Sequence, residues 1–185
     1  MTTPQDRPAD ASELIAFWKA AGPARWFAKD AEFDRELRER FLPSHERAAR
    51  GELEAWLEQP HAALAIVLLL DQFPRNSFRD SPRMYATDEL ARHAARRAIQ
   101  RGHDRAVEPE LRLFFYLPYQ HSESLLDQMR GVELFGDLAP ELMVHAVTHR
   151  DVVERFGRFP HRNAILGRPS SEAELAFLAA GGFGG

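Results

Sequence analysis

The chain has 185 residues, of which 44% are hydrophobic and 28% charged, and this composition suits one globular domain with its own core. Its formal net charge of -4 argues against nonspecific binding to nucleic acid or to a membrane surface, which depends on clustered positive charge. The absence of cysteine excludes disulfides, thiolate zinc sites and cysteine nucleophiles.

No segment resembles a secretory signal or a membrane span. The N-terminal residues MTTPQDRPAD are polar, so we expect residues 1–9 to be flexible. The longest apolar block, Ala62 to Leu70, is about half as long as a bilayer-spanning helix. Arg97, Arg101 and Arg105 form only a thin basic stripe on a predicted helix, which is typical of a solvated face. We therefore expect a cytoplasmic protein that binds neither nucleic acid nor membrane.

The first two predicted helices have clear boundary signals. Asp10 and Glu13 have the spacing of a capping box, and Gly22 with the following proline should end the helix that they begin. A second amphipathic segment starts near Asp30 and should end at Pro43, because proline disrupts a helix interior.

The next predicted helix is the most apolar part of the chain. Pro60 suits the first helical position, and the residues HAALAIVLLLDQF that follow are apolar almost all round. Such a helix has no face to present to water, so we expect it to lie at the centre with other helices around it.

The rest of the chain contains a series of helix start signals, each a Ser or Pro before an apolar periodic segment: Ser81, Pro82, Pro109, Ser122, Pro140 and Ser171. Ser171 and Glu174 have the spacing of a capping box for the last helix. The tail after that helix is rich in glycine, and we expect residues 181–185 to be flexible.

These signals together predict an all-α fold, since no segment alternates with the period of two that is typical of strands. Short Pro or Gly turns between successive helices favour antiparallel helical hairpins. The 34-residue repeat of tetratricopeptide proteins is not visible. We therefore expect residues 1–185 to form a single domain, an irregular array of hairpins around one central apolar helix.

Two stretches contain Phe-Pro followed by an Arg-Asn pair. The first is DQFPRN at 71–76, and the second is RFGRFPHRNAILGR at 155–168. Each occurs where proline should stop a helix. Asp71 falls in the last turn of the apolar helix, where a carboxylate needs a cation. Arg75 can supply it, or the arginines of the second stretch can if the two stretches meet, which is our hypothesis.

A third polar element is His121-Ser122-Glu123, at a predicted helix start. Neighbouring residues on a helix point in different directions, so these three do not form a hydrolase triad. Ser122 is more simply a helix cap, and Glu123 is favourable in a first turn. His121 either packs in the core or faces the other polar residues.

Arginines and histidines outnumber carboxylates among these elements. The basic residues are Arg75, Arg158, Arg162, His121 and His161, and the carboxylates are Asp71 and Glu123. A locally positive cluster near a helix N-terminus suits a carboxylate or phosphate. The alternative is a structural network in which the same side chains hold the loops.

His145 and His149 have the i, i+4 spacing of a metal-binding pair. No third ligand lies at suitable spacing, although Asp151 is close. We predict no metal and no cofactor.

The segments DQFPRN, LPYQHSE and RFGRFPHRNAILGR, in this order, resemble a widespread bacterial family of domains of unknown function. The likeness extends from LIAFW near the start to SSEAELAFL near the end, and it implies a tetratricopeptide-like all-helical fold and a cytosolic protein. Gln120 stands where similar proteins often have Glu. The positions that match the motif residues of the family are our candidate ligand-binding residues: Asp71, Gln72, Arg75, Asn76, His121, Glu123, Arg158, His161, Arg162 and Asn163.

Three functional hypotheses follow. The first is a binding protein whose arginine- and histidine-rich pocket holds a small anionic ligand or a peptide carboxylate. The second is a hydrolase that uses His121 or His161 as a general base. The third is a protein-interaction scaffold in which the polar cluster is purely structural. The sequence leaves the oligomeric state open.

Overall fold

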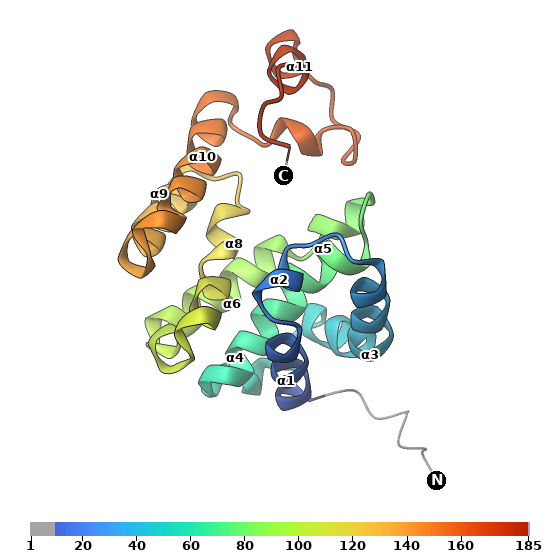
Figure 1. Cartoon of the computed structure of the whole chain (residues 1–185), viewed down its shortest axis with the longest axis vertical. Coiled ribbons are helices and arrows are strands. Elements are labelled where there is room, and N and C mark those ends of the chain that lie inside the picture. Colours follow the sequence, from blue (N-terminus) through green and yellow to red (C-terminus); the bar gives the residue numbers. More distant parts are fainter. Residues whose placement is uncertain (1–9, 185) are drawn as a thin grey trace. The chain divides into compact units, whose positions relative to one another are not determined.

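The computed structural model of the chain describes residues 10–184, except for the side chain of Pro140. No strand occurs between residues 10 and 184, and the all-α prediction is confirmed (Figure 1). The helical elements are α1 (Ala11–Ala21), α2 (Pro23–Trp26), α3 (Ala31–Ala49), η2 (Glu54–Glu58), α4 (Pro60–Val67), η3 (Leu68–Gln72), α5 (Phe73–Ser77), η4 (Pro82–Tyr85), α6 (Asp88–Gln100), η5 (His103–Ala106), α7 (Pro109–Arg112), η6 (Leu113–Phe115), α8 (Leu117–Gln120), α9 (Leu125–Leu138), α10 (Pro140–Phe156), η7 (Pro160–Arg162) and α11 (Glu172–Ala179). Tetratricopeptide likeness stays a prediction.

The helices divide between two compact units. The N-terminal unit comprises Met1–Arg79 and Arg83–Phe115, and the C-terminal unit comprises Asp80–Pro82 and Tyr116–Gly185. Each unit has its own core, described below. That residues 1–185 form a single domain stays a prediction, and the predicted flexibility of residues 1–9 lies outside the described residues.

The core of the N-terminal unit surrounds α4, as the apolar sequence of that helix predicted. All residues from 63 to 74 are buried, and α4 packs against α1 and α6. An aromatic group closes one side of this core: the ring of Phe114 lies 5.4 Å from Trp18 and 5.1 Å from Trp26, edge-on in both cases. The central apolar helix is therefore confirmed for this unit.

Pro43 does not end a helix. It lies inside α3, which continues to Ala49, so the predicted break was wrong. A proline leaves the carbonyl of the residue four positions earlier without its helical donor. Here that carbonyl belongs to Glu39, an exposed residue at which water can take the place of the donor.

Pro74 does not end its helix either, and this prediction was also wrong. The chain passes from α4 through the single π-helical turn η3 into α5. Because Pro74 has no N–H, it leaves the carbonyls of Leu70 and Leu69 without the donors of an α- or a π-helix. The Thr87 hydroxyl donates to the Leu70 carbonyl at 2.6 Å, and Nδ1 of His45 donates to that of Leu69 at 2.8 Å.

The buried side chains of Thr87 and His45 thus satisfy the acceptors that the proline exposes. Burial is the main reason that the pKa of His45 lies below its usual value, so the ring is neutral with its proton on Nδ1. This replacement of backbone donors by side chains explains how a Phe-Pro pair continues inside a helix.

The C-terminal unit is built on the α9–α10 hairpin, whose helices lie side by side (Figure 1). The α8 segment packs closely on α9 at Gly131, where an added Cβ would lie 3.4 Å from that of Tyr119. The amide of Gln128 donates to the carbonyls of Gln120, at 2.7 Å, and Ser122, at 2.6 Å. The turn that carries His121 and Glu123 is thereby fixed to α9.

Ser122 is not the cap of α9, contrary to the prediction. The N-cap is Ser124, and the hydroxyl of Ser122 instead donates to Asp127 at 2.7 Å. By contrast, the capping boxes at Asp10 and at Ser171 are both confirmed. Each spacing correctly located the first turn of its helix.

The second Phe-Pro stretch follows the end of α10 as predicted. Gly157 ends the helix in the left-handed conformation, with φ of 68°, which glycine adopts without strain. The core that follows contains Val152, Val153 and Phe159, with the rings of Phe156, Phe177 and Phe183 packed against it. Residues of α10, of the loop that follows it, of α11 and of the C-terminal tail therefore share one small core.

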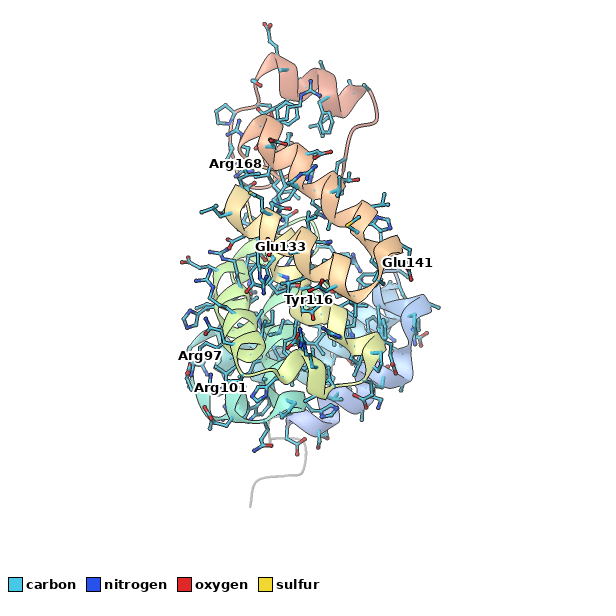
Figure 2. The ribbon with its side chains drawn as sticks, turned by 90° about the vertical axis from the view of Figure 1, so that its left-hand side faces the viewer. Arg97, Arg101, Tyr116, Glu133, Glu141 and Arg168 are labelled. Atoms are coloured by element: carbon cyan, nitrogen blue, oxygen red, sulfur yellow. The ribbon has the colours of Figure 1, made fainter. Side chains whose placement is uncertain are left out.

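Between residues 10 and 184 we find no helix that is both long enough and apolar enough to cross a membrane. The predicted basic stripe does not lie on one helix: Arg97 lies in α6, Arg101 is the C-cap residue of α6 (Figure 2), and Arg105 lies in η5 beyond Gly102. Arg97 pairs with Glu54 at 2.5 Å and Arg101 with Glu58 at 3.2 Å. These pairs reduce the positive field along the stripe.

Candidate functional site

Arg75 of the first Phe-Pro stretch lies between two carboxylates. It is 3.3 Å from the Asp71 carboxylate and forms a bidentate pair with Asp88 at 2.8 and 3.0 Å. Burial opposes its charge, but Asp71 and Asp88 raise the pKa of Arg75 above its usual value. The predicted need of Asp71 for a cation is met by Arg75, and Gln72 also donates to Asp71 at 2.5 Å.

Asn76 is also bound within the N-terminal unit. Its amide donates to Asp34 at 2.8 Å, and Asp34 accepts a second hydrogen bond from Arg79 at 2.6 Å. All four candidates of the first stretch therefore have structural contacts: Gln72 and Asp71 bond within η3, and Arg75 and Asn76 join α5 to α6 and α3. That the first and second Phe-Pro stretches meet in space stays a prediction.

Two bidentate ion pairs organise the second stretch in the C-terminal unit. Arg158 donates to both oxygens of Glu174, at 2.7 and 2.8 Å. Arg168, labelled in Figure 2, donates to both oxygens of Glu123, at 2.7 and 2.9 Å. Bidentate pairs of this kind are strong and fix the direction of both side chains. They tie α11 and the turn before α9 to the loop that follows α10.

The same contacts keep both carboxylates ionised. The hydrogen bond from Arg158, with help from the Ser171 N–H, lowers the pKa of Glu174 to about 2. Burial opposes the charge of Glu123, yet the bonds from Arg168 and from the Phe159 N–H hold its pKa below the usual value. These carboxylates are engaged with arginines and are poor candidates for an acid or a base.

Asn163 closes the loop that carries Arg168. Its amide donates to the Ser170 hydroxyl at 3.0 Å, and its oxygen accepts from Nε of Arg168 at 3.0 Å. Asn163 therefore positions Arg168, which in turn holds Glu123.

Three groups that can carry positive charge surround the buried ring of Phe159. The ring centres of His149 and His161 lie 5.9 and 5.6 Å from that of Phe159, and the guanidinium carbon of Arg162 lies 4.6 Å from it. We call His149, His161 and Arg162 the histidine–arginine cluster. All three residues come from α10 and η7, so the short loop between these elements brings them together.

Both histidines are neutral at pH 7. Burial, followed by the neighbouring positive groups, lowers the pKa of His149 to about 4, and burial followed by the charge of Arg162 lowers that of His161 to about 4. His121 is among the groups that lower the pKa of His149. Nδ1 of His149 donates to the His145 carbonyl at 2.7 Å, while Nδ1 of His161 is buried without a hydrogen bond. The site is therefore one where added negative charge would be stabilised.

The ring of Phe183 covers the two histidines. Its centre lies 4.4 Å from that of His149, 5.3 Å from that of His161 and 5.9 Å from that of Phe159. The sequence analysis expected a flexible segment at residues 181–185, of which residue 185 lies outside the described residues.

A metal site is not evident. Among residues 10–184 no group of three or more His, Cys, Asp or Glu side chains has the arrangement of metal ligands. His145 and His149 contact one another through the backbone carbonyl that accepts from Nδ1 of His149.

The candidate residues of the C-terminal unit fall into two sets. His161 and Arg162 belong to the histidine–arginine cluster, His121 acts on it through its charge, and Glu123, Arg158 and Asn163 hold the surrounding loops. Three contributors are not among the candidates from the sequence: His149, which was considered only for a metal, Phe159 and Phe183. The i, i+12 separation of His149 and His161 does not indicate in the sequence that they are close, because α10 ends between them.

Fold and site together define an all-α protein with a histidine- and arginine-lined aromatic core in its C-terminal unit. The chain belongs to the family described as bacterial protein of unknown function (DUF924), whose model matches residues 14–182. It is similar to the solved structure of a protein of unknown function from Agrobacterium tumefaciens, with 52% identity and a TM-score of 0.90, over 92% of this chain and 97% of that one. A comparison with curated proteins gives no match.

Proposed function

We propose that this protein binds a small anionic ligand at the histidine–arginine cluster. The observation that carries the proposal is the convergence of His149, His161 and Arg162 on one ring, that of Phe159. Guanidinium and imidazolium groups are the side chains that bind carboxylate and phosphate best, and partial burial strengthens their attraction for an anion.

Charge balance in the surroundings supports the same conclusion. The carboxylates of Glu123 and Glu174 are paired with Arg168 and Arg158. The charge of Glu123 opposes the low pKa of His161 only in part, because both oxygens of Glu123 accept hydrogen bonds from Arg168. Arg162, in turn, contributes to the low pKa of both histidines. An incoming anion would reverse that effect and allow the histidines to take up protons.

The proposal makes binding depend on pH. The two histidines have a pKa of about 4 in the ligand-free protein, and an anion raises it. Affinity therefore increases as the pH falls through the raised pKa of the complex towards 4. Each unit by which a histidine pKa rises corresponds to about 1.4 kcal/mol, or about tenfold in affinity.

Calorimetric titration with inorganic phosphate and with acetate tests this proposal. We expect tighter binding at pH 5 than at pH 7.5, with proton uptake measured as a dependence of the heat on the buffer. His161→Asn should weaken binding at pH 5 by about tenfold or more, since it removes a charge-assisted hydrogen bond. Arg162→Lys should also weaken it, because lysine cannot form the bidentate contact.

Arg150→Ala is the matched control for the titration. Arg150 lies on α10 beside the cluster residue His149, but it pairs with its neighbour Asp151. Equal affinities at pH 5 and pH 7.5, or the same loss in Arg150→Ala as in His161→Asn, would contradict a site at the cluster.

Fewer observations support the hydrolase hypothesis and the scaffold hypothesis. A hydrolase would use neutral His161 as its base, but Glu123, the carboxylate whose charge acts on it, is held by Arg168 and by the Phe159 N–H. A base without an orienting group is a weak catalyst. A scaffold would use apolar surface, and exposed Leu126 and Met129 on α9 are the residues that a partner would cover.

A further inference from the structure

We propose that the ligand is an aromatic acid, a ring that carries a carboxylate or phosphate group, and that Phe183 occupies the place of this ring in the ligand-free protein. This inference rests on the proposed function, because it assigns the charged half of the ligand to the histidine–arginine cluster. It adds that the uncharged half of the ligand is an aromatic ring, and that the side chain of Phe183 competes with this ring for the same place.

The walls around Phe183 have the geometry of an aromatic subsite. The ring meets His149 at an interplanar angle of 60° and His161 at 71°, with centre separations of 4.4 and 5.3 Å. Phe159 forms a further wall at 5.9 Å. Edge-to-face contacts at such separations favour a flat ring over an aliphatic group of equal size. Protonation of either histidine adds a cation–π attraction for the same ring.

Phe183 fills only part of what this site can bind. Its ring is uncharged, whereas Arg162 lies 4.6 Å from Phe159, the ring that Phe183 itself contacts. A ligand ring in the same place would lie against both histidines and against Phe159, the ring over which the Arg162 guanidinium lies. Phe183 makes the aromatic contacts of this place but brings no negative charge to it.

The attachment of Phe183 to α11 allows this exchange. The helix ends at Ala179, Gly181 follows its C-cap with a φ of +75° that suits glycine, and the Gly182 N–H donates to the Phe177 carbonyl at 2.9 Å. The chain then turns back towards α10, so a single side chain reaches the histidines. A change of a few backbone angles at Gly182 or Gly184 would withdraw the ring without disturbing α11.

The test compares ligands with and without a ring, in the wild type and in Phe183→Ala. The probes are phenylacetate against acetate and phenyl phosphate against inorganic phosphate, titrated by calorimetry at pH 5. We expect Phe183→Ala to bind phenylacetate about tenfold more tightly than the wild type, since a ring no longer has to be displaced. Acetate affinity should stay within about twofold, because its contacts do not involve the ring.

Phe177→Ala is the matched control. It also removes a ring from the C-terminal segment, but Phe177 packs on Phe156, 5.1 Å away, and not on the histidines. We expect it to leave the ratio of phenylacetate to acetate affinity at the wild-type value.

A second measurement needs no ligand. Phe183→Ala should raise the pKa of His149 and of His161 above 4 towards 6.5, because it removes part of the burial that lowers them. Gly182→Ala should act in the same direction, since its Cβ would lie 2.5 Å from the Phe177 carbonyl oxygen and displace the segment while the ring is retained. Histidine proton shifts in NMR measure both.

Three results would overturn the inference. Unchanged histidine pKa values in Phe183→Ala would show that the ring does not cover the site. Equal gains for acetate and phenylacetate would show that no ring subsite opens. Binding of acetate and phosphate without any preference for their aromatic forms would refute the ligand class and leave the proposed function standing, whereas failure of all four probes would refute both.

Discussion

Replacement of Thr87 by valine tests how the N-terminal unit accommodates a proline inside its central helix. Valine has nearly the same shape as threonine but no hydroxyl, so the change removes the hydrogen bond to the Leu70 carbonyl, which measures 2.6 Å. Pro74 cannot supply a substitute, because it has no N–H. The carbonyl is then left buried without a donor.

The expected loss of stability follows from leaving the Leu70 carbonyl without a hydrogen-bond donor. An unsatisfied buried acceptor costs about 1–3 kcal/mol, and Thr87 is buried, so we expect Thr87→Val to reduce the free energy of unfolding by about 2 kcal/mol. Ser12→Ala is the control. The Ser12 hydroxyl also donates a hydrogen bond, to the Asp10 carboxylate at 2.6 Å, but it lies exposed on α1 of the same unit, where water replaces it. We expect it to cost less than about 0.5 kcal/mol.

Tryptophan fluorescence during urea unfolding is the assay. Trp18, Trp26 and Trp56 account for all 3 tryptophans of the chain and lie in the N-terminal unit, so the signal reports on that unit. A loss of 2 kcal/mol corresponds to a midpoint shift of about 1 M, for a urea dependence of about 2 kcal/mol per molar.

A double-mutant cycle with Pro74→Ala isolates the cause. Alanine restores an N–H in the helix, so the cost of Thr87→Val should fall by about 1 kcal/mol or more in the Pro74→Ala background. If Thr87→Val costs the same in both backgrounds, the hydroxyl does not compensate for the proline and the explanation of the π-helical turn is refuted.

Three further predictions concern the ion pairs and the histidines. Arg75→Ala should reduce the free energy of unfolding by about 3–5 kcal/mol in the same fluorescence assay, because it removes the cation that pairs with the fully buried Asp71 carboxylate. A reduction near zero would contradict this. Arg158→Ala should release α11, seen as new amide signals for residues 172–179 in NMR, whereas unchanged signals would show that the bond to Glu174 is dispensable. The C-terminal unit should lose stability as the pH falls from 6.5 to 4, because His149 and His161 take up protons in the unfolded chain at a higher pH than in the folded one. It should lose more between pH 4.5 and 2, because Glu174 also takes up its proton at a higher pH in the unfolded chain. His149→Asn should flatten the first of these losses in NMR-monitored unfolding, and an unchanged slope would contradict the low histidine pKa.

The helix starts were predictable because their chemistry is local. The capping boxes at Asp10 and Ser171 and the first-turn proline at Pro60 each satisfy backbone groups within the same turn, so a few consecutive residues carry the whole signal. Gly157 was predictable for the same reason, since only local backbone conformation matters there.

The wrong predictions share a different physical origin. Pro74 continues a helix because Thr87 and His45, which are distant in sequence, donate to the freed carbonyls. Ser122 is drawn away from its expected capping role by Asp127, a partner that becomes available only when α9 is formed. Tertiary contacts decide both cases, and single-sequence patterns do not contain them.

The candidate site was predictable in part. His161 and Arg162 stood out because the Phe-Pro stretch gathers polar residues in a short loop. Phe183 did not, because a single aromatic residue among glycines looks like a frayed end until its ring is placed against His149. The residues of this site come from α10, from η7 and from the C-terminal tail, so no periodic sequence pattern connects them.

The measurement that tests the central claim most directly is an NMR titration of the histidine side chains with and without inorganic phosphate. The account predicts that His149 and His161 titrate near pH 4 in the free protein and that saturating phosphate raises the pKa of at least one of them by about one unit or more. The side-chain signals of the exposed His93, on α6 of the N-terminal unit, serve as the internal reference. Titration of both cluster histidines at the same pH in the presence and absence of phosphate would contradict an anion site there.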